Sequence, residues 1–253
     1  MARRQSRGMT TVAVLTDPPH PETALPELVA ETPLSGTEAA ELYTALLKDT
    51  VLAAERSGGE VLINYRPADS LGLTIDSEAT IRDAIADVYD PETTRFEVQV
   101  GETFAGRAGN TATHLLETED VGSVGIARPE AALLARTDID SAAMKLRSSP
   151  VVLGPTSDGR VTYAAFREPI DFADCYTAPA VETLTDRALD AGLDVEFLET
   201  KQYLQNERDL AELIVSVRTR LKADALVPPY FGEWVAGTDL VVSVDADGCP
   251  AIR

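Results

Sequence analysis

The chain has 253 residues, of which 44% are hydrophobic, so it is long enough to bury a full core as one large domain. Its 42 acidic residues against 22 basic ones give a formal net charge of −20 at pH 7, which argues against a nucleic-acid-binding protein. Cys175 and Cys249 are too few for a disulfide framework or a four-thiolate zinc site, and no apolar stretch approaches the roughly 18 to 20 residues of a membrane span.

Lysine is scarce, and arginine supplies most of the positive charge. Lys48, Lys145, Lys201 and Lys222 are the only lysines. Lysine depletion with an excess of acid indicates a halophilic protein, because molar salt shortens the Debye length to about 3 Å and screens the self-repulsion. Residues 1–8 carry three arginines but lack the apolar core of a signal peptide. We therefore expect a disordered N-terminal arm at 1–8 and a cytoplasmic protein.

The first half of the chain alternates strands and amphipathic helices. The β-branched run at 11–15 predicts a buried strand, and a long loop follows it. Ser35 and Glu38 have capping-box spacing, which predicts a helix from there to about Arg56. The segments that follow are predicted in the order strand, helix, strand, helix and strand: 60–65, 77–88, 96–100, 105–117 and 121–127.

The second half continues the alternation with one exception. Helical turns across 129–147, broken near Thr137, precede two apolar runs separated by two glycine-containing turns, which predicts a wide hairpin in place of a helical crossover. Beyond it we predict a helix starting at Pro179 and ending before Gly192, a strand and a second helix, and finally a C-terminal hairpin with a turn at Asp247-Gly248. The segments from the wide hairpin onwards are 150–153, 161–166, 179–191, 195–198, 207–222, 240–244 and 249–253.

Strands separated by helices predict a three-layer α/β fold with a mostly parallel central sheet covered on both faces. We assign residues 9–222 to this domain and 223–253 to a C-terminal extension that carries a small β-hairpin. Tyr230, Phe231 and Trp234 form the one aromatic cluster, which we interpret as packing for this extension.

The sequence lacks the motifs of several common classes of enzyme. The chain has no P-loop, no glycine fingerprint after its first strand and no Gly-x-Ser-x-Gly elbow. His20 and His114 are the only histidines, too few for a three-histidine metal site. These absences argue against P-loop kinases, dinucleotide-binding enzymes and serine hydrolases.

Four segments resemble, in order, a small family of transferase-like proteins. The chain reads TVAVLTDPPHPETAL at 11–25, AAELYTALLKDTVLA at 39–53 and VVLGPTSDG at 151–159, and residues 177–198 complete the match. The family is similar to the GT-A glycosyltransferases and related to phospholactate guanylyltransferase, and this chain resembles a divergent haloarchaeal-type member. The resemblance implies a nucleotide-diphospho-sugar transferase-like fold, with a nucleotide bound over the ends of the first strands and a divalent metal held by an aspartate.

The chain departs from the family pattern at its charged positions. Relatives carry Lys-Thr-Arg-Leu where this chain has Glu22-Thr23-Ala24-Leu25, and Ala127 stands where they carry the metal aspartate. Magnesium or manganese is thus expected from the family, but this sequence predicts no metal at Ala127. The resemblance implies substrate-binding positions in the first loop, in the hairpin turn and before the following helix: Thr23, Gly154, Pro155, Asp158, Gly159 and Thr177.

Asp138 and Asp140 offer a substitute for the missing carboxylate. Their spacing in extended backbone aims two carboxylates at one cation. Asp140 also directly precedes a helical run, and we favour a helix cap over a metal ligand. Both interpretations stay open at this point.

The middle of the chain is a nearly neutral island. Between Arg95 and Arg167, seven arginines and one lysine face nine acids. We expect Arg107, Arg128 and Arg160 to hold a phosphate there, with Asn110 adding hydrogen bonds. The alternative is that these arginines pair with local acids on a solvated face.

Together these features predict a transferase-like protein that binds an anionic small molecule, namely a nucleotide, a nucleotide-sugar or a sugar phosphate. The ligand is expected between the first-strand loop and the Gly154 loop, with nucleotidyl or glycosyl transfer as the reaction. No catalytic residue is assigned. The alternative is a catalytically silent binding or regulatory protein that kept the fold and lost the metal site.

Overall fold

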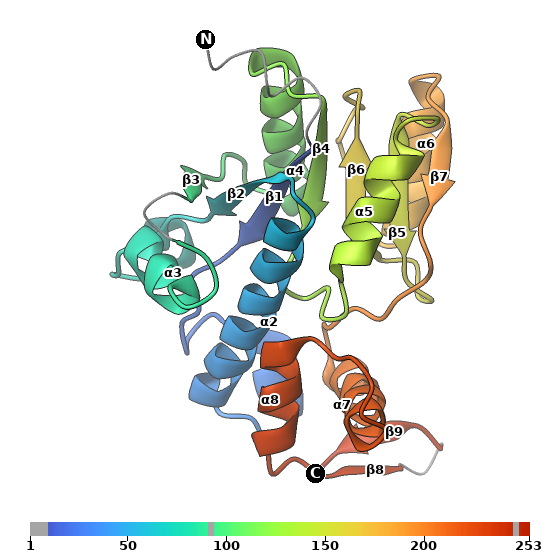
Figure 1. Cartoon of the computed structure of the whole chain (residues 1–253). Helices are drawn as coiled ribbons and strands as arrows, with labels where there is room; N and C mark the ends of the chain where they lie inside the picture. The colour runs from blue at the N-terminus through green and yellow to red at the C-terminus, as the bar shows by residue number, and fades with distance from the viewer. Residues whose placement is uncertain (1–9, 91–93, 245–247) are drawn as a thin grey trace.

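The computed structural model describes residues 10–90, 94–244 and 248–253 (Figure 1). The arm expected at 1–8 and Asp247 of the expected turn lie outside the described residues. The strands are β1 Thr10–Thr16, β2 Glu60–Tyr65, β3 Arg95–Val98, β4 Ser123–Ala127, β5 Val151–Pro155, β6 Val161–Phe166, β7 Val195–Phe197, β8 Val242–Val244 and β9 Pro250–Ile252. The helices are α1 Pro26–Glu31, α2 Gly36–Arg56, α3 Ser77–Ile85, α4 Phe104–Thr113, α5 Arg136–Lys145, α6 Ala180–Asp190, α7 Glu207–Lys222 and α8 Pro229–Gly237, with single turns η3 Ala68–Leu71 and η4 His114–Thr118.

Seven strands form one sheet in the order β3-β2-β1-β4-β6-β5-β7. All neighbouring pairs are parallel except those of β6, which runs antiparallel to both β4 and β5. The mostly parallel sheet and the wide β5-β6 hairpin are therefore confirmed. Within the described part of the chain, no helix is long and apolar enough to cross a membrane.

The strand order reverses at β1. The chain runs outward from β1 through β2 to β3, then returns to β4 on the other side of β1. Thr16 pairs with Tyr65, and Val14 with Ala127, so β1, β2 and β4 end near the same edge. In open α/β sheets, ligands bind in the crevice outside the carboxyl ends of the strands where the order reverses. The topology alone therefore directs attention to the ends of β1 and β4.

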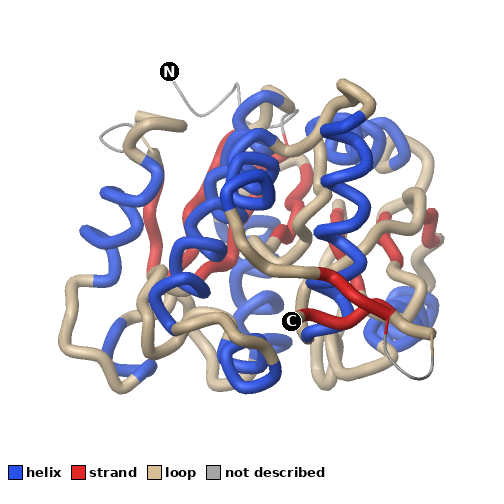
Figure 2. The backbone as a smooth tube through the Cα atoms, turned by 90° about the horizontal axis from the view of Figure 1, so that it is seen from below, coloured by secondary structure: helices blue, strands red, loops and turns tan. Residues whose placement is uncertain are grey.

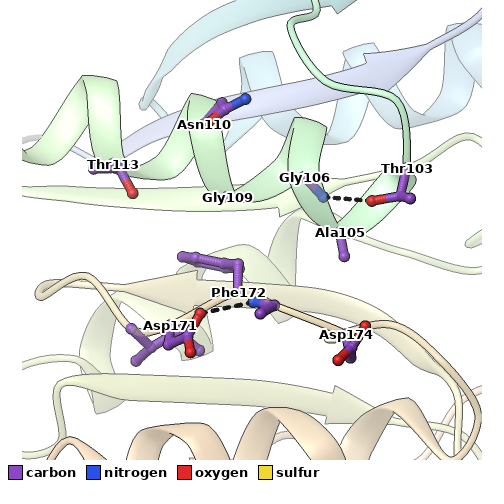
Figure 3. A pocket seen from close by; sticks show the side chains of 11 residues that line it. Thr103, Ala105, Gly106, Gly109, Asn110, Thr113, Asp171, Phe172 and Asp174 are labelled. Carbon is purple, nitrogen blue, oxygen red and sulfur yellow. Dashed lines mark hydrogen bonds between the residues drawn. The ribbon is translucent and has the colours of Figure 1, made fainter.

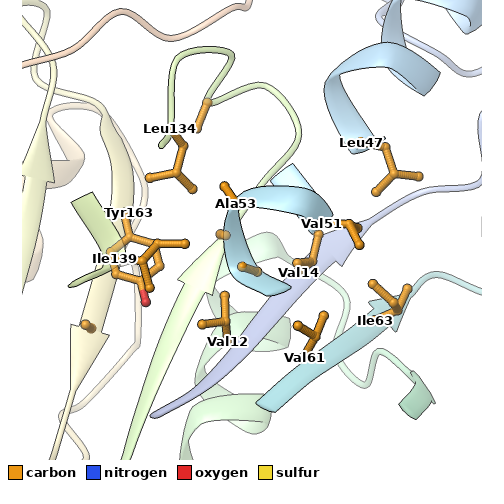
Figure 4. Packing of buried hydrophobic residues seen from close by; sticks show 14 of the residues in the cluster. Val12, Val14, Leu47, Val51, Ala53, Val61, Ile63, Leu134, Ile139 and Tyr163 are labelled. Atoms are coloured by element: carbon orange, nitrogen blue, oxygen red, sulfur yellow. The ribbon is translucent and has the colours of Figure 1, made fainter. Parts of the chain in front are cut away.

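Helices cover both faces of the sheet, so that the strands run between them (Figure 2). On one face Val51 of α2 lies near Val14 of β1, and Ile139 of α5 lies beside Tyr163 of β6 (Figure 4). On the other face α4 packs over β4, and α6 packs over β5 and β7 with Leu184 fully buried. Strands covered on both sides become continuous apolar runs, as in the sequence of β1. The three-layer arrangement matches the predicted fold class.

The helix after β4 starts earlier than the sequence prediction. The predicted break near Thr137 lies at residues 134–135, which separate the turns after β4 from α5, and α5 then runs uninterrupted from Arg136 to Lys145. Asp140 does not cap a helix but lies inside α5, where it pairs with Arg136 at 3.0 Å. Asp138 takes the capping role and accepts a hydrogen bond from the Ala135 amide at 2.7 Å. The helix therefore starts five residues before the start directly after Asp140 that the sequence indicated.

The C-terminal extension contains α8, a helix that the sequence prediction missed. The three clustered aromatic residues lie on it, and Phe231 is fully buried, so their packing role is confirmed. Asp49 of α2 accepts hydrogen bonds from the Tyr230 amide at 3.1 Å and the Phe231 amide at 2.7 Å, which satisfies the free start of α8. The antiparallel β8-β9 hairpin is confirmed, and β9 lies against α7.

Candidate functional site

A cavity of about 600 Å³ opens at the carboxyl ends of β1 and β4, where the strand order reverses. The loop after β1 forms one wall. Arg66, which follows β2, and Arg128 and Glu130, which follow β4, form the floor and the opposite wall. The remaining lining residues come from the same loop, from helix α2 and the η3 turn, and from two later segments: Asp17, Pro18, Glu22, Thr23, Ala24, Leu25, Pro26, Glu27, Tyr43, Leu71, Tyr176, Tyr203, Leu204 and Gln205.

Three arginines and two aromatic rings alternate beside this cavity. The Arg128 guanidinium lies 4.4 Å from the Phe104 ring centre and 5.7 Å from that of Tyr203. Arg107 approaches the Phe104 ring at 5.9 Å, and Arg160 approaches the Tyr203 ring at 5.7 Å. Each ring face attracts the cations beside it. The two rings thus link Arg107, Arg128 and Arg160 through cation-π contacts.

The arginines at this site differ in their electrostatic surroundings. Burial lowers the pKa of Arg107, and the positive charges of Arg66 and Arg128 lower it further. Burial also opposes the charge of Arg128, but the carboxylate of Glu130 and other nearby acids raise its pKa above the ordinary value. The site thus gathers three positive charges that carry an energetic cost unless negative charge compensates them.

Two carboxylates already compensate part of this charge. Asp17 pairs with Arg66 at 3.2 Å, and Glu130 pairs with Arg128. Arg107 has no carboxylate partner within the described residues, and its terminal nitrogen donates to the Glu102 carbonyl at 2.9 Å. Arg107 is therefore the site's unpaired cation.

Four polar atoms around the cavity lack hydrogen-bond partners. They are buried yet unpaired in the described part of the molecule: Thr23 Oγ1, Arg107 Nε, Glu130 Oε2 and Tyr176 Oη. Thr23, Glu130 and Tyr176 line the cavity. Arg107 does not line it, but lies close enough to two lining arginines, Arg66 and Arg128, for their charges to lower its pKa. Burial strongly raises the pKa of the Tyr176 hydroxyl, so it stays protonated and can donate. Native proteins rarely leave such atoms unpaired, and groups of them need an explanation.

A buried polar network supports the site from behind. The Gln99 side chain donates to the Thr16 carbonyl at 3.2 Å and to the Asn64 carbonyl at 2.7 Å, so it joins the ends of β1 and β2. Thr111 of α4 donates to the Asn64 side chain at 2.8 Å. Asp17 and Arg66 follow these strand ends directly, so the network determines where their charges lie. Sequence analysis missed it, although polar residues in otherwise apolar strands were a visible signal.

The predicted site residues fall into three groups. Thr23 and Arg128 line the cavity, while Arg107 and Arg160 stand beside it through the aromatic rings. Asn110 instead borders a second cavity of about 480 Å³ between α4 and residues 170–174 (Figure 3), and its amide donates to the Val100 carbonyl. The remaining predicted residues do not line the β1-β4 cavity: Gly154, Pro155, Asp158, Gly159 and Thr177.

The charged side chains of the turn between β5 and β6 are already paired within the protein. Asp158 accepts a hydrogen bond from Thr156 and pairs with Arg160 at 2.7 Å. Arg160 also pairs with Asp209 at the start of α7, again at 2.7 Å. A Cβ at Gly154 would lie 2.7 Å from the Thr162 hydroxyl, so glycine is needed there for packing. Residues 203–205 line the β1-β4 cavity, and the Gly154 loop, which was expected beside the ligand, does not.

The position beside Ala127 offers poor ligands for a divalent cation. Alanine supplies no oxygen, and Asp138 is engaged by Lys201 and by the Ala135 amide. Asp140 pairs with Arg136 on α5. Among the residues that the structure describes, no group of three or more His, Cys, Asp or Glu side chains is arranged to hold a metal ion. The donor set beside Ala127 therefore does not fit the metal that the resemblance implies.

Sequence analysis missed Arg66, Tyr176 and Tyr203. Arg66 was detectable, because it directly follows a predicted strand that neighbours the first one. Tyr203 was not, since its segment reaches the site through distant backbone hydrogen bonds such as that from the Leu204 amide to the Glu130 carbonyl at 2.8 Å. Tyr176 has a positive φ of 65°, a local conformation that the sequence did not announce.

No protein-family model matches the chain, and no curated protein matches its sequence. Solved structures do match its fold. A protein from Desulfovibrio desulfuricans G20 assigned as a nucleotide-diphospho-sugar transferase aligns over 90% of this chain and 96% of its own length, with 16% identity and a TM-score of 0.69.

Two further structures agree. The 4-diphosphocytidyl-2C-methyl-D-erythritol synthase of Anaerococcus prevotii DSM 20548 aligns over 83% of this chain and 98% of its own, with 12% identity and a TM-score of 0.53. Rv0371c of Mycobacterium tuberculosis H37Rv, solved in complex with manganese, aligns over 82% and 99%, with 12% identity and a TM-score of 0.50. At such low identity these matches establish the fold, and the chain has the nucleotide-diphospho-sugar transferase-like fold that the sequence predicts.

Proposed function

We propose that the protein binds a nucleotide, a nucleotide-sugar or a sugar phosphate in the β1-β4 cavity and transfers a nucleotidyl or glycosyl group from it. One observation carries the proposal: unpaired polar atoms surround a cavity at the reversal of strand order, next to Arg107, Arg66 and Arg128. Arginine recognises phosphate through fixed, charge-assisted hydrogen bonds. Transfer in such a site would depend on orienting the ligand and neutralising its charge.

The structural neighbours support the same class of reaction. They include a protein assigned as a nucleotide-diphospho-sugar transferase and a 4-diphosphocytidyl-2C-methyl-D-erythritol synthase, both with this fold. Kinship with phospholactate guanylyltransferase and a haloarchaeal origin are further parts of the proposal, supported by the sequence segments described above. Since folds of this kind host many activities, the unpaired atoms weigh more than the likeness.

A second candidate is a catalytically silent binding protein with the same ligand. Ala127 favours it, because one solved neighbour was obtained with manganese while this chain has alanine at the expected ligand position. We propose that ligand binding here is independent of metal and is carried by arginine. Calorimetric titration of UTP and glucose 1-phosphate, with and without Mg²⁺, on wild type and on Ala127→Asp tests this. Binding by wild type that requires Mg²⁺ would contradict it.

The proposed setting is a cytoplasm of high salt. The net charge of −20 makes self-repulsion the expected weakness of the fold in dilute buffer. We expect the melting temperature to rise steeply between low and molar potassium chloride, where the Debye length falls to about 3 Å. A melting temperature that stays constant across that range of salt concentration would refute the proposed adaptation to high salt.

A thermal-shift panel of nucleoside phosphates, nucleotide-sugars and sugar phosphates tests the binding function itself. A ligand present at about a hundred times its dissociation constant stabilises the folded state by about 2.7 kcal/mol. Turnover of the ligand that binds separates the transferase from the silent binding protein. The absence of any shift with every class of phosphate compound would overturn the proposed function.

A further inference from the structure

We propose that the ligand carries a single phosphate group on a body rich in hydroxyl or amino groups, as in a sugar phosphate or an amino-sugar phosphate, and that nucleoside triphosphates are excluded. This inference rests on the proposed function and narrows it. It follows from the charges of the cavity and from the atoms there that lack partners.

The positive charge near the cavity that is not already paired is enough to balance one phosphate group. Arg66 and Arg128 are already paired, with Asp17 and Glu130 respectively. Of Arg66, Arg107 and Arg128, Arg107 alone has no carboxylate partner among the described residues, and its Nε is buried without a partner. A phosphate monoester carries about 1.5 to 2 negative charges at pH 7, which one free arginine and a share of its neighbours can balance. A triphosphate chain carries more charge than this set can neutralise.

Part of the cavity lining is acidic. Glu22 of the first-strand loop and Glu27 at the start of α1 are exposed, and both line the cavity. Glu22 stands where the family that this chain resembles carries lysine, and Ala24 stands where that family carries arginine. A polyphosphate reaching along this loop would meet like charge, which costs free energy at close range. Hydroxyl and ammonium groups are the complementary partners, because ionised carboxylates only accept hydrogen bonds.

The unpaired atoms fit a ligand of this kind. The free Oε2 of Glu130 requires a donor, and the hydroxyls of Thr23 and Tyr176 can both donate and accept. Hydroxyl groups on a sugar supply both functions in one ring. The ligand would place its phosphate toward Arg107 and its hydroxyl or amino groups toward Glu130 and the first-strand loop.

Calorimetric titrations with defined probes test the inference. The probes are glucose 1-phosphate, glucosamine 1-phosphate, UDP-glucose and UTP, each with and without Mg²⁺. We expect the two sugar phosphates to bind about tenfold or more tightly than UTP. Binding of UTP that equals or exceeds that of both sugar phosphates overturns the inference and leaves the proposed function standing. Binding of none of the probes overturns both.

A charge reversal supplies an independent test. Glu22→Lys places a cation where the first-strand loop now repels polyphosphate, so we expect it to tighten UTP binding about tenfold. Glu41→Lys is the matched control, because Glu41 is an exposed carboxylate on α2 that borders a different groove. We expect it to change UTP binding less than about twofold, since distant exposed charges are screened. An equal gain in both variants, or none in Glu22→Lys, contradicts the assignment of the acidic lining.

Discussion

The sequence predicts that the loop after β1 and the β5-β6 turn both contact the ligand. In the structure, the loop after β1 lines the β1-β4 cavity and the β5-β6 turn does not. In the turn, Thr156, Asp158 and Arg160 satisfy one another, and Arg160 extends the set to Asp209 of α7. At the cavity, Arg107 has no ion pair in the described part of the chain, and buried polar atoms remain unpaired. The turn satisfies its own polar groups, whereas the cavity leaves several polar atoms without partners among the described residues.

This contrast shows what distinguishes a binding loop from a structural one. The two loops look alike in sequence, because turns and ligand-binding loops draw on the same polar and turn-forming residue types. The difference lies in whether their hydrogen bonds close within the protein, and buried polar groups without partners cost about 1 to 3 kcal/mol each. The following four substitutions test the contrast, starting with the largest expected effect.

Arg107→Met should weaken binding of glucose 1-phosphate about a hundredfold, because it removes the only cation at the site that has no carboxylate partner. Its melting temperature should stay unchanged or rise, since a costly buried charge is lost. Calorimetry and thermal melting measure the two effects. Arg147→Met, at an exposed arginine after α5, is the control and should bind normally. Normal binding by Arg107→Met would place the phosphate elsewhere.

Arg160→Ala should lower the stability of the protein and leave ligand affinity nearly unchanged, which is the opposite of Arg107→Met. It removes two charged interactions, one with Asp158 inside the β5-β6 turn and one with Asp209 that ties the turn to α7. The free energy of unfolding should therefore fall by about 2 to 3 kcal/mol. Affinity for glucose 1-phosphate should change less than about threefold. Denaturant unfolding provides the stability, with Arg208→Ala as a control whose exposed pair with Glu212 is worth about 0.5 kcal/mol or less. A large loss of affinity with intact stability would return Arg160 to the ligand site.

Asp49 differs from both regions, because its two carboxylate oxygens accept hydrogen bonds but its charge is buried. Desolvation raises its pKa to about 6, although the Phe231 and Tyr230 amides oppose this. The folded state therefore holds a proton that the unfolded state has released between pH 4 and 6, so Asp49 contributes stability at low pH that is lost as pH rises through about 6.

The contribution of Asp49 to the free energy of unfolding should fall by on the order of 2 kcal/mol between pH 4 and 6 in wild type. This contribution should be absent in Asp49→Asn. Unfolding by urea between pH 4 and 8 gives the difference between the two proteins at each pH. Taking the difference removes the titration of all other groups. A constant difference would show that Asp49 has an ordinary pKa.

Tyr163→Phe should have the smallest effect. The Tyr163 hydroxyl is buried without a partner in the described structure, but it lies in the core and not at a cavity, directly over Gly125 (Figure 4). Removing it should leave stability unchanged or raise it by about 1 kcal/mol, with ligand affinity unaffected. Thermal melting measures this. A loss of more than about 1 kcal/mol would indicate a partner for the hydroxyl.

The sequence by itself determined the elements that depend on neighbouring residues. The strand Glu60–Tyr65 and the helix Glu207–Lys222 were predicted to the residue, and the capping box of Ser35 and Glu38 is present. Their signals are local: apolar periodicity, caps and turn residues act within a few positions. The alternation of such elements was enough to predict a three-layer α/β fold.

Only the tertiary structure decided which residues share a site. Arg66, Arg107 and Arg128 come from different strand ends and a helix, and they meet because β4 returns to the side of β1 opposite β2. Tyr203 joins them because backbone hydrogen bonds from Leu198, Lys201 and Leu204 hold its segment against β5 and the residues after β4. The same packing pairs Arg160 with Asp209, which lies 49 positions away. Whether a charge is satisfied or free depends on such distant partners, and no local pattern in the sequence encodes them.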